Sequence, residues 1–134
     1  KNTGTVGGSD MLEEEMLAQK AWAVVGANQN PEKYGHMIYA KLKRKGYRVY
    51  AVNPRYESID GEPCYAALSD LPERVAVVNM VVAPKAGRAY IEEAAQLGVP
   101  YVWFQPGTFS DELGLLADRL GLKYVQACAL VATR

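Results

Sequence analysis

The stretch VAVVNMVVA at residues 75–83 constrains the fold more than any other part of this sequence, because it is apolar at both odd and even positions. Successive side chains of a strand point to opposite faces of a sheet, so this pattern predicts a strand covered on both faces. The stretch AWAVVGA at residues 21–27 has the same property. Strands of this kind form parallel sheets that lie between two layers of helices.

Segments with strand and helix patterns alternate along the chain. Further strands are predicted for residues 48–54, 101–105 and 123–132. Helices are predicted for residues 10–20 with Asp10 as N-cap, 36–47 ending at Gly46, 85–98 ending at Gly98, and 110–121 with Ser110 as N-cap. The alternation predicts one α/β domain with a single doubly wound parallel sheet of about five strands, Rossmann-like, in the order 3-2-1-4-5. The domain is expected to span residues 11–134, after a disordered lead-in or non-native remnant at residues 1–10.

The charge balance limits the partners of the protein. Fifteen Lys and Arg residues balance fifteen Asp and Glu residues, so no overall field attracts nucleic acid or a membrane surface. The longest apolar runs are far shorter than the ~20 residues needed to cross a bilayer, and the first residues lack the apolar segment of a signal peptide. We therefore expect a cytoplasmic protein, with any anion site confined to one locality.

The two cysteines and the single histidine offer little for a metal or catalytic site. Cys64 and Cys128 are far apart in the sequence and are expected to be reduced thiols. Cys128 is interpreted as a small, buried apolar side chain, whereas Cys64 lies in a predicted loop. Because His36 is the only histidine, a histidine-based metal centre or a Ser-His-Asp triad is not expected, and no metal site is predicted.

The loop GANQNPEKYG at residues 26–35 has features of a phosphate-binding loop. Gly26 follows the first strand and allows the backbone to turn sharply and to approach a ligand. The helix that begins near Gly35 directs its positive end toward the same space, and Lys33 adds a charge. The loop therefore predicts a site for a phosphorylated ligand at the carboxyl ends of the strands.

The spacing excludes two common nucleotide motifs. A dinucleotide fingerprint requires a glycine at the sixth position, where this loop has Pro31, and a Walker loop requires a Gly-Lys-Ser/Thr that is missing. An NAD enzyme also needs an acidic residue after strand two, but Asn53, Pro54 and Arg55 stand there. A cation at this position suits a ligand with a phosphate on its adenosine ribose, such as NADP or coenzyme A (CoA).

Five segments together resemble a known family. They are VVGANQNPEKYG, GYRVYAVNPR, IDGEPCYAALSDLPERV, VWFQPGTFSDE and GLKYVQAC. In this order they resemble the small bacterial and archaeal CoA-binding proteins, which are similar to the first domain of succinyl-CoA synthetase alpha subunits. The resemblance extends over residues 16 to 130 and implies a Rossmann-like domain with CoA as its cofactor.

The resemblance also implies a set of binding residues in four loops. The resemblance implies that the phosphates are bound by Gly26, Ala27, Asn28, Lys33 and Gly35, and the region of the adenosine 3′-phosphate by Asn53, Pro54 and Arg55. It implies that the adenine rests on an apolar shelf formed by Val82, Ala83 and Pro84. The pantetheine path would be lined by Gln105, Pro106 and Gly107. Two departures stand out. Asn28 replaces a frequent serine or threonine, and Gln126, Ala127 and Cys128 replace a common Asp-Arg-Cys triplet. The domain that carries the phosphorylated histidine of the synthetases has no counterpart in this chain.

These features together predict a protein that binds CoA or an acyl-CoA without catalysing a reaction, since no nucleophile, base and oxyanion site are found together. Two alternatives stay open: an NADP-binding reductase-like domain, and a regulatory interaction module with a vestigial pocket. A mixed disulfide of Cys64 with the ligand's thiol is not favoured. The sequence leaves open whether Cys64 or Cys128 reacts with that thiol, which acyl group is preferred, and whether the chain forms a homodimer.

Overall fold

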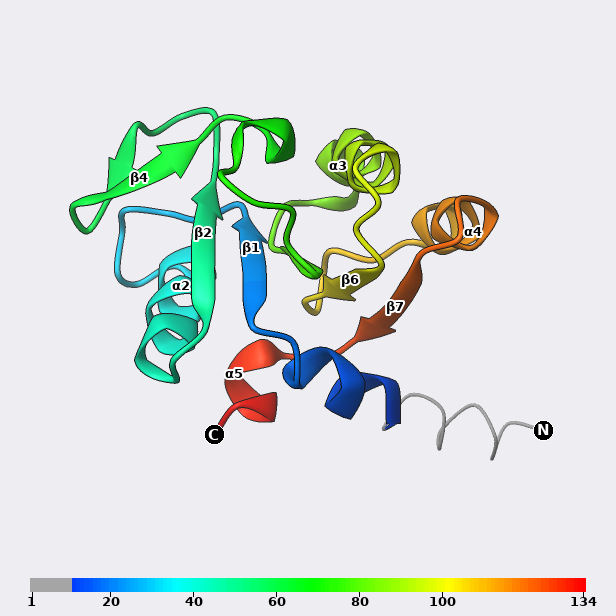
Figure 1. Cartoon of the computed structure of the whole chain (residues 1–134), viewed down its shortest axis with the longest axis horizontal. Coiled ribbons are helices and arrows are strands. Elements are labelled where there is room, and N and C mark those ends of the chain that lie inside the picture. Colours follow the sequence, from blue (N-terminus) through cyan, green and yellow to red (C-terminus); the bar gives the residue numbers. More distant parts are fainter. Residues whose placement is uncertain (1–10) are drawn as a thin grey trace.

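The computed structural model describes residues 11–134, so the expected lead-in at residues 1–10 and the Asp10 cap lie outside the described residues. Within them, helices flank a seven-stranded sheet (Figure 1). The strands are β1 (Ala21–Val25), β2 (Arg48–Val52), β3 (Ser58–Ile59), β4 (Glu62–Tyr65), β5 (Val77–Met80), β6 (Tyr101–Phe104) and β7 (Lys123–Gln126). The helices are α2 (Tyr34–Arg44), α3 (Pro84–Gln96), α4 (Asp111–Arg119) and α5 (Ala129–Ala132), with a 3-10 turn η1 (Leu68–Asp70) and a helical segment at 11–17. The expected α/β class with a single, mostly parallel sheet is confirmed.

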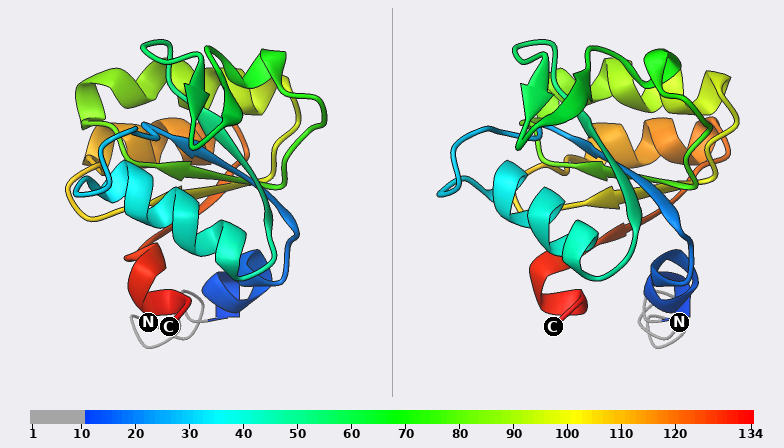
Figure 2. Two further views of the ribbon diagram at one scale, coloured as in Figure 1. Left: turned by 90° about the vertical axis from the view of Figure 1, so that its left-hand side faces the viewer. Right: turned by 60° about the vertical axis from the view of Figure 1, so that its left-hand side comes forward.

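Helices cover both faces of the sheet, as predicted from strands that are apolar at both odd and even positions. α2 and α5 lie against one face, and α3 and α4 lie against the other (Figure 2). β1 and β5 at the centre are buried at every position. Asn79 of β5 is the polar exception, because it is fully buried and its amide atoms have no hydrogen-bond partner among residues 11–134. Its burial therefore opposes folding.

The strand order differs from the expected one. The sheet runs β3-β4-β2-β1-β5-β6-β7, so the five predicted strands stand in the order 2-1-3-4-5. The third of them, β5, pairs with β1, and the place beside β2 belongs to the unpredicted strand β4. If β4 is counted as the third strand, the parallel sheet has the order 3-2-1-4-5-6.

The missed strand belongs to a short hairpin. β3 and β4 pair over two residue pairs, and only one of their six residues is fully buried, so no apolar alternation marks them. Asp60 and Gly61 join them with φ values of 53° and 80°. Both residues thus have the positive φ that a two-residue type I′ turn requires, and Asp-Gly is a typical sequence for it. This dipeptide is the signal that predicts the hairpin.

The last predicted strand, 123–132, is wrong in its second half. β7 ends at Gln126, and residues 129–132 form α5. Two side chains of β6 and its loop hold the chain away from the sheet: Trp103 Nε1 donates to Ala127 O at 2.8 Å, and Gln105 Oε1 accepts from Ala129 N at 2.6 Å. These tertiary bonds override the strand-like composition of the segment.

The predicted N-cap of α4 and the predicted C-terminal glycines of α2 and α3 are confirmed. Ser110 Oγ accepts a hydrogen bond from Leu113 N at 3.2 Å and caps α4. Gly46 and Gly98 follow α2 and α3 with φ values of 93° and 80°, as C-terminal glycines do. Among residues 11–134 no helix combines the length and the apolar character needed to cross a bilayer.

An ion pair joins β2 to the segment that precedes β5, and it generates a pH prediction. Arg48 Nε lies 2.8 Å from Glu73 Oε2, and Tyr50 Oη donates to the same carboxylate. The hydrogen bonds from Arg48 and then Tyr50 lower the pKa of Glu73 from 4.5 to about 2. The stabilisation is therefore present above pH 4.5 and is lost as the pH falls toward 2.

We expect Glu73→Gln to cause a small decrease in the urea midpoint of unfolding at pH 7, because this partly exposed pair is screened by solvent. The difference from the wild type should shrink as the pH falls below 4.5, where the pair is progressively lost. Urea titrations at pH 7 and pH 3 measure it. A difference that is larger at pH 3 would contradict the assignment.

Candidate functional site

A cavity of about 450 Å³ opens at the carboxyl ends of β1, β5, β6 and β7. β1 and β5 adjoin there, and their following helices lie on opposite faces of the sheet, which makes this the switch point where α/β sheets bind ligands. The cavity is lined by Gly26, Asn28, Lys33, Tyr34, Gly35, Val81, Val82, Ala83, Gln105, Pro106, Gly107, Thr108 and Cys128. Nine of these residues were predicted from the sequence.

Two glycines bring the start of α2 against the end of β1. A Cβ on Gly35 would lie 2.1 Å from the carbonyl oxygen of Gly26, so no larger residue fits there. Gly26 has φ of +98°, and a Cβ at this position would meet the backbone of Val81 at 3.0 Å. The backbone of the loop thus lies directly over the strand ends, as a backbone-lined anion site requires.

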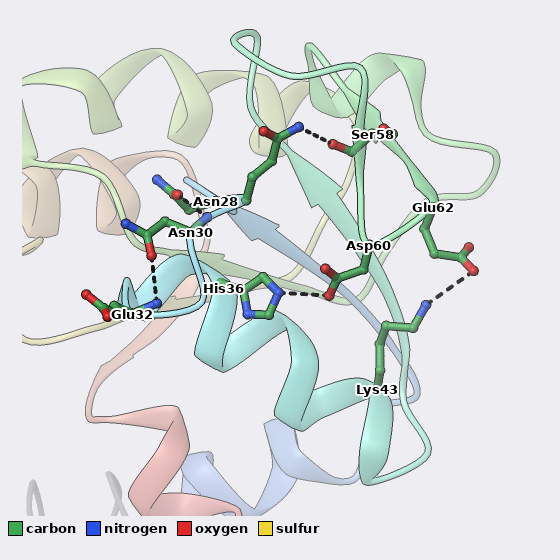
Figure 3. Close-up of polar contacts among 9 residues, drawn as sticks. Asn28, Asn30, Glu32, His36, Lys43, Ser58, Asp60 and Glu62 are labelled. Atoms are coloured by element: carbon green, nitrogen blue, oxygen red, sulfur yellow. Dashed lines mark hydrogen bonds and ion pairs between the residues drawn. The ribbon is translucent and has the colours of Figure 1, made fainter.

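The loop between these glycines is held by its own asparagines. Asn28 Oδ1 accepts from Asn30 N at 2.8 Å, and Asn30 Oδ1 accepts from Glu32 N at 2.9 Å (Figure 3). Such bonds between an asparagine and the amide two residues on produce successive turns. Lys33 then serves as the N-cap of α2 without a side-chain capping bond. Since His36 N already donates to Lys33 O, the N–H groups of Tyr34 and Gly35 are the ones in the first turn left for a ligand.

The hairpin β3–β4 fastens the outer side of this loop. His36 Nε2 and Asp60 Oδ2 are 2.8 Å apart, and Lys43 Nζ lies 3.8 Å from Glu62 Oε2 (Figure 3). Gln29 Nε2 also donates to Ser58 O at 2.9 Å. The hairpin therefore restrains both the loop and the helix whose N-terminus lines the cavity. This also explains His36 as a structural residue.

The predicted residues after β2 lie outside the cavity. Asn53 Nδ2 donates to Ala27 O at 2.8 Å, and Asn53 Oδ1 accepts from Arg55 N at 2.9 Å. Asn53 thereby supports the phosphate loop and turns the chain so that Pro54 and Arg55 are exposed. Of the two cations predicted for this edge of the sheet, Lys33 lines the cavity and Arg55 does not.

The other two predicted loops reach the cavity almost completely. Val82 and Ala83 line it, while Pro84 begins α3 and does not. Gln105, Pro106 and Gly107 all line it, and Thr108 Oγ1 closes the turn by donating to Gln105 O at 2.7 Å. Ala27 is fully buried beneath the loop and packs in the α2 core instead.

Four lining residues were missed: Tyr34, Val81, Thr108 and Cys128. Tyr34 is 60% exposed at the mouth of the cavity, and its place between Lys33 and Gly35 is a signal that sequence analysis had available. Cys128 was interpreted as buried, but it is only partly buried, because the chain leaves the sheet after β7. That departure could not be inferred from the sequence pattern.

The thiol of Cys128 has an unusual environment. Burial alone would raise its pKa, but a hydrogen bond from Gln105, bonds from the backbone of Val131 and Leu130, and the charge of Lys41 together lower the pKa of Cys128 below 9.0. By contrast, burial raises the pKa of Cys64, which does not line the cavity. The pKa values of the two thiols are therefore shifted in opposite directions.

The electrostatics of the cavity favour an anion. Within the described part of the chain, Lys33 is the cation on its wall, and neither a carboxylate nor a histidine lines it. The positive end of α2 adds to the field of Lys33. Among residues 11–134 no group of His, Cys, Asp and Glu is arranged to hold a metal ion. The arrangement can bind an anionic group at one side and apolar or amide groups at the other.

The contact of Gly35 with Gly26 can be tested by substitution. Gly35→Ala should lower the free energy of unfolding by about 3 kcal/mol, because the added methyl group would force two backbone segments apart. Gly46→Ala is the matched control: its added Cβ meets nothing within 4 Å, so it should cost only the strain of positive φ, about 1 kcal/mol. Urea unfolding measures both. Equal decreases in the free energy of unfolding would show that the close approach of Gly35 to Gly26 does not restrict the residue at position 35.

Solved structures of similar proteins share this fold over most of the present chain. A hypothetical protein from Pyrococcus horikoshii OT3 has a TM-score of 0.87 and 35% identity, and the alignment covers 92% of this chain and 88% of that one. The dinucleotide forming acetyl-coenzyme A synthetase 1 of Ca. Korarchaeum cryptofilum has a TM-score of 0.73 and 29% identity, over 82% of this chain and 26% of the synthetase.

Sequence comparison agrees with the structural one. The acetate–CoA ligase [ADP-forming] I of Archaeoglobus fulgidus is 34% identical over 122 residues, which are 84% of this chain but only 18% of the ligase. The chain thus corresponds to a small part of that enzyme. The family model for the CoA binding domain matches residues 20–134. The resemblance predicted from the five segments is confirmed, and the chain belongs to the CoA-binding domain family.

Proposed function

We propose that this protein binds CoA or an acyl-CoA in the cavity at the switch point and that it does so without catalysing a reaction. The observation that carries the proposal is the close contact of Gly26 and Gly35, which leaves the first turn of α2 uncapped beside Lys33. Membership of the CoA-binding domain family supports CoA as the ligand.

The residues of the cavity fit the chemically different parts of CoA. The N–H groups at the start of α2 and the ammonium of Lys33 suit its phosphates. Val82 and Ala83 offer an apolar wall, and Gln105 and Thr108 offer a polar one. The cavity volume of about 450 Å³ lies within the range of small-molecule sites. A ligand as long as CoA would extend from it along the surface.

A binding role is supported by the side chains that line the cavity. Catalysis of acyl or phosphoryl transfer needs a nucleophile beside a base, or a group that carries the transferred unit. Thr108 donates its hydroxyl to a carbonyl oxygen rather than to a base, and His36 is engaged by Asp60 outside the cavity. We therefore assign the protein no catalytic residue.

CoA should stabilise the folded protein, because a ligand that binds only the native state raises its melting temperature. A concentration of one hundred times the dissociation constant adds about 2.7 kcal/mol, which corresponds to a rise of about 5 °C or more for a domain of this size. Thermal unfolding under reducing conditions measures the effect. No shift with millimolar CoA would contradict the proposal, and a shift with NADPH alone would support a reductase-like domain instead.

The charge of Lys33 can be isolated with a matched pair of variants on the two ends of α2. Lys33→Met should weaken CoA binding about tenfold, the loss expected for one charge-assisted contact with a phosphate. Lys45→Met removes the same charge at the C-terminal end of the helix, away from the cavity, and should leave the affinity unchanged. Isothermal titration calorimetry compares them. Equal affinities of the two variants would remove Lys33 from the site.

A further inference from the structure

We infer that Cys128 is a site of covalent attachment for the ligand, where its thiolate exchanges with a disulfide of CoA and keeps one CoA as a mixed disulfide. This inference rests on the proposed function, because it requires CoA to enter the cavity. It goes further by assigning a chemical reaction to one wall of that cavity and by making the site responsive to the redox state of its ligand.

The first observation is the position of the thiol. Cys128 lines the same cavity as the start of α2, Lys33 and the loop after β6. It is partly buried and precedes α5, whose first residue is anchored by Gln105 Oε1. CoA carries its thiol at the end opposite to its adenosine. A molecule whose phosphates lie at α2 therefore has its thiol free to reach another wall of the cavity.

The second observation is a nearly buried amide on the wall that carries Cys128. Gln105 is only 4% exposed and lines the cavity. Its side-chain oxygen already accepts from Ala129 N, so the amide nitrogen is the part of Gln105 that can donate to a neighbour. Its interaction with the sulfur lowers the pKa of Cys128, and the same amide faces a ligand that enters the cavity.

The third observation concerns charge. Lys41 of α2 donates to Leu130 O at 3.1 Å, which fixes its ammonium beside α5. Its charge and the hydrogen bonds to the sulfur lower the pKa of Cys128, although burial opposes this effect. The thiolate is the reactive form in disulfide exchange. The cavity thus combines a partly exposed, activated sulfur with an anion site.

Cys64 provides an internal contrast in the same chain. Its Sγ donates to Asn53 O at 3.5 Å, burial raises its pKa, and it lies outside the cavity. Both cysteines are partly buried and unpaired. A difference in their reactions with a CoA disulfide would therefore arise from the cavity rather than from the presence of a thiol.

The reaction is balanced without any further oxidant. The Cys128 thiolate attacks one sulfur of the CoA disulfide, a new S–S bond forms between the protein and one CoA, and the original S–S bond breaks. The second CoA leaves as a thiolate and takes a proton from solvent. The oxidising equivalent comes from the CoA disulfide, and an excess of any small thiol reverses the step.

The test uses the reduced full chain, incubated without oxygen with CoA disulfide and, separately, with the neutral bis(2-hydroxyethyl) disulfide. Intact mass should increase by one CoA less two hydrogens, and peptide mapping should place the adduct on Cys128. Labelling of Cys128 by CoA disulfide should be at least about tenfold faster than labelling of Cys64, with the neutral disulfide reporting the intrinsic reactivity of each thiol. Cys64→Ser is the matched control and should be labelled like the wild type.

The outcomes separate this inference from the proposed function. Desulfo-CoA, which has no thiol, should slow the labelling of Cys128 and should raise the melting temperature of the reduced wild type. If desulfo-CoA stabilises the protein but CoA disulfide labels Cys64 and Cys128 equally, or labels neither, the inference is overturned and the binding function stands. If desulfo-CoA neither stabilises the protein nor slows the labelling, the proposed function itself fails.

Discussion

The contact between the backbones of Gly26 and Gly35 is the constraint on which the site depends. A Cβ on Gly35 would lie only 2.1 Å from the oxygen of Gly26. Because glycine has no Cβ, α2 can begin directly over the end of β1. The positive end of the helix is thereby fixed at the centre of the sheet, where β1 and β5 adjoin. A side chain at either position would displace it, and the amides that suit a phosphate would no longer lie beside Lys33.

The surroundings of this contact are organised to maintain it. Asn53 supports the loop from the side of β2 by bonding to Ala27 O, and the hairpin β3–β4 holds its outer side through Gln29 and His36. On the far wall, Gln105 anchors the start of α5 and so fixes the position of Cys128. These polar side chains therefore act as supports of the cavity wall.

The sequence predicts the fold well where burial is periodic and less well where tertiary contacts decide. The apolar strands, the capping residue Ser110 and the loop residues Gly26, Lys33 and Gly35 follow from local patterns, whereas the other six predicted cavity residues came from the family resemblance. The predicted order of the strands was wrong because β4 is short and none of its residues is fully buried, so that its only local signal is the Asp-Gly turn. The segment after β7 was wrong because two hydrogen bonds from β6 and its loop bend it into a helix. The position of Arg55 depends on the hydrogen bonds of the Asn53 side chain, and these bonds cannot be predicted from the spacing of residues in the sequence.

We expect the first turn of α2 and the loop before it to hold the phosphates of CoA. A titration of the ¹⁵N-labelled, reduced protein with CoA can locate the phosphates through the backbone amide resonances. The amides of Asn28, Tyr34 and Gly35 should shift most, since a phosphate that accepts their hydrogens changes their environment directly. Saturable shifts confined to other loops, with these three amides unchanged, would contradict it.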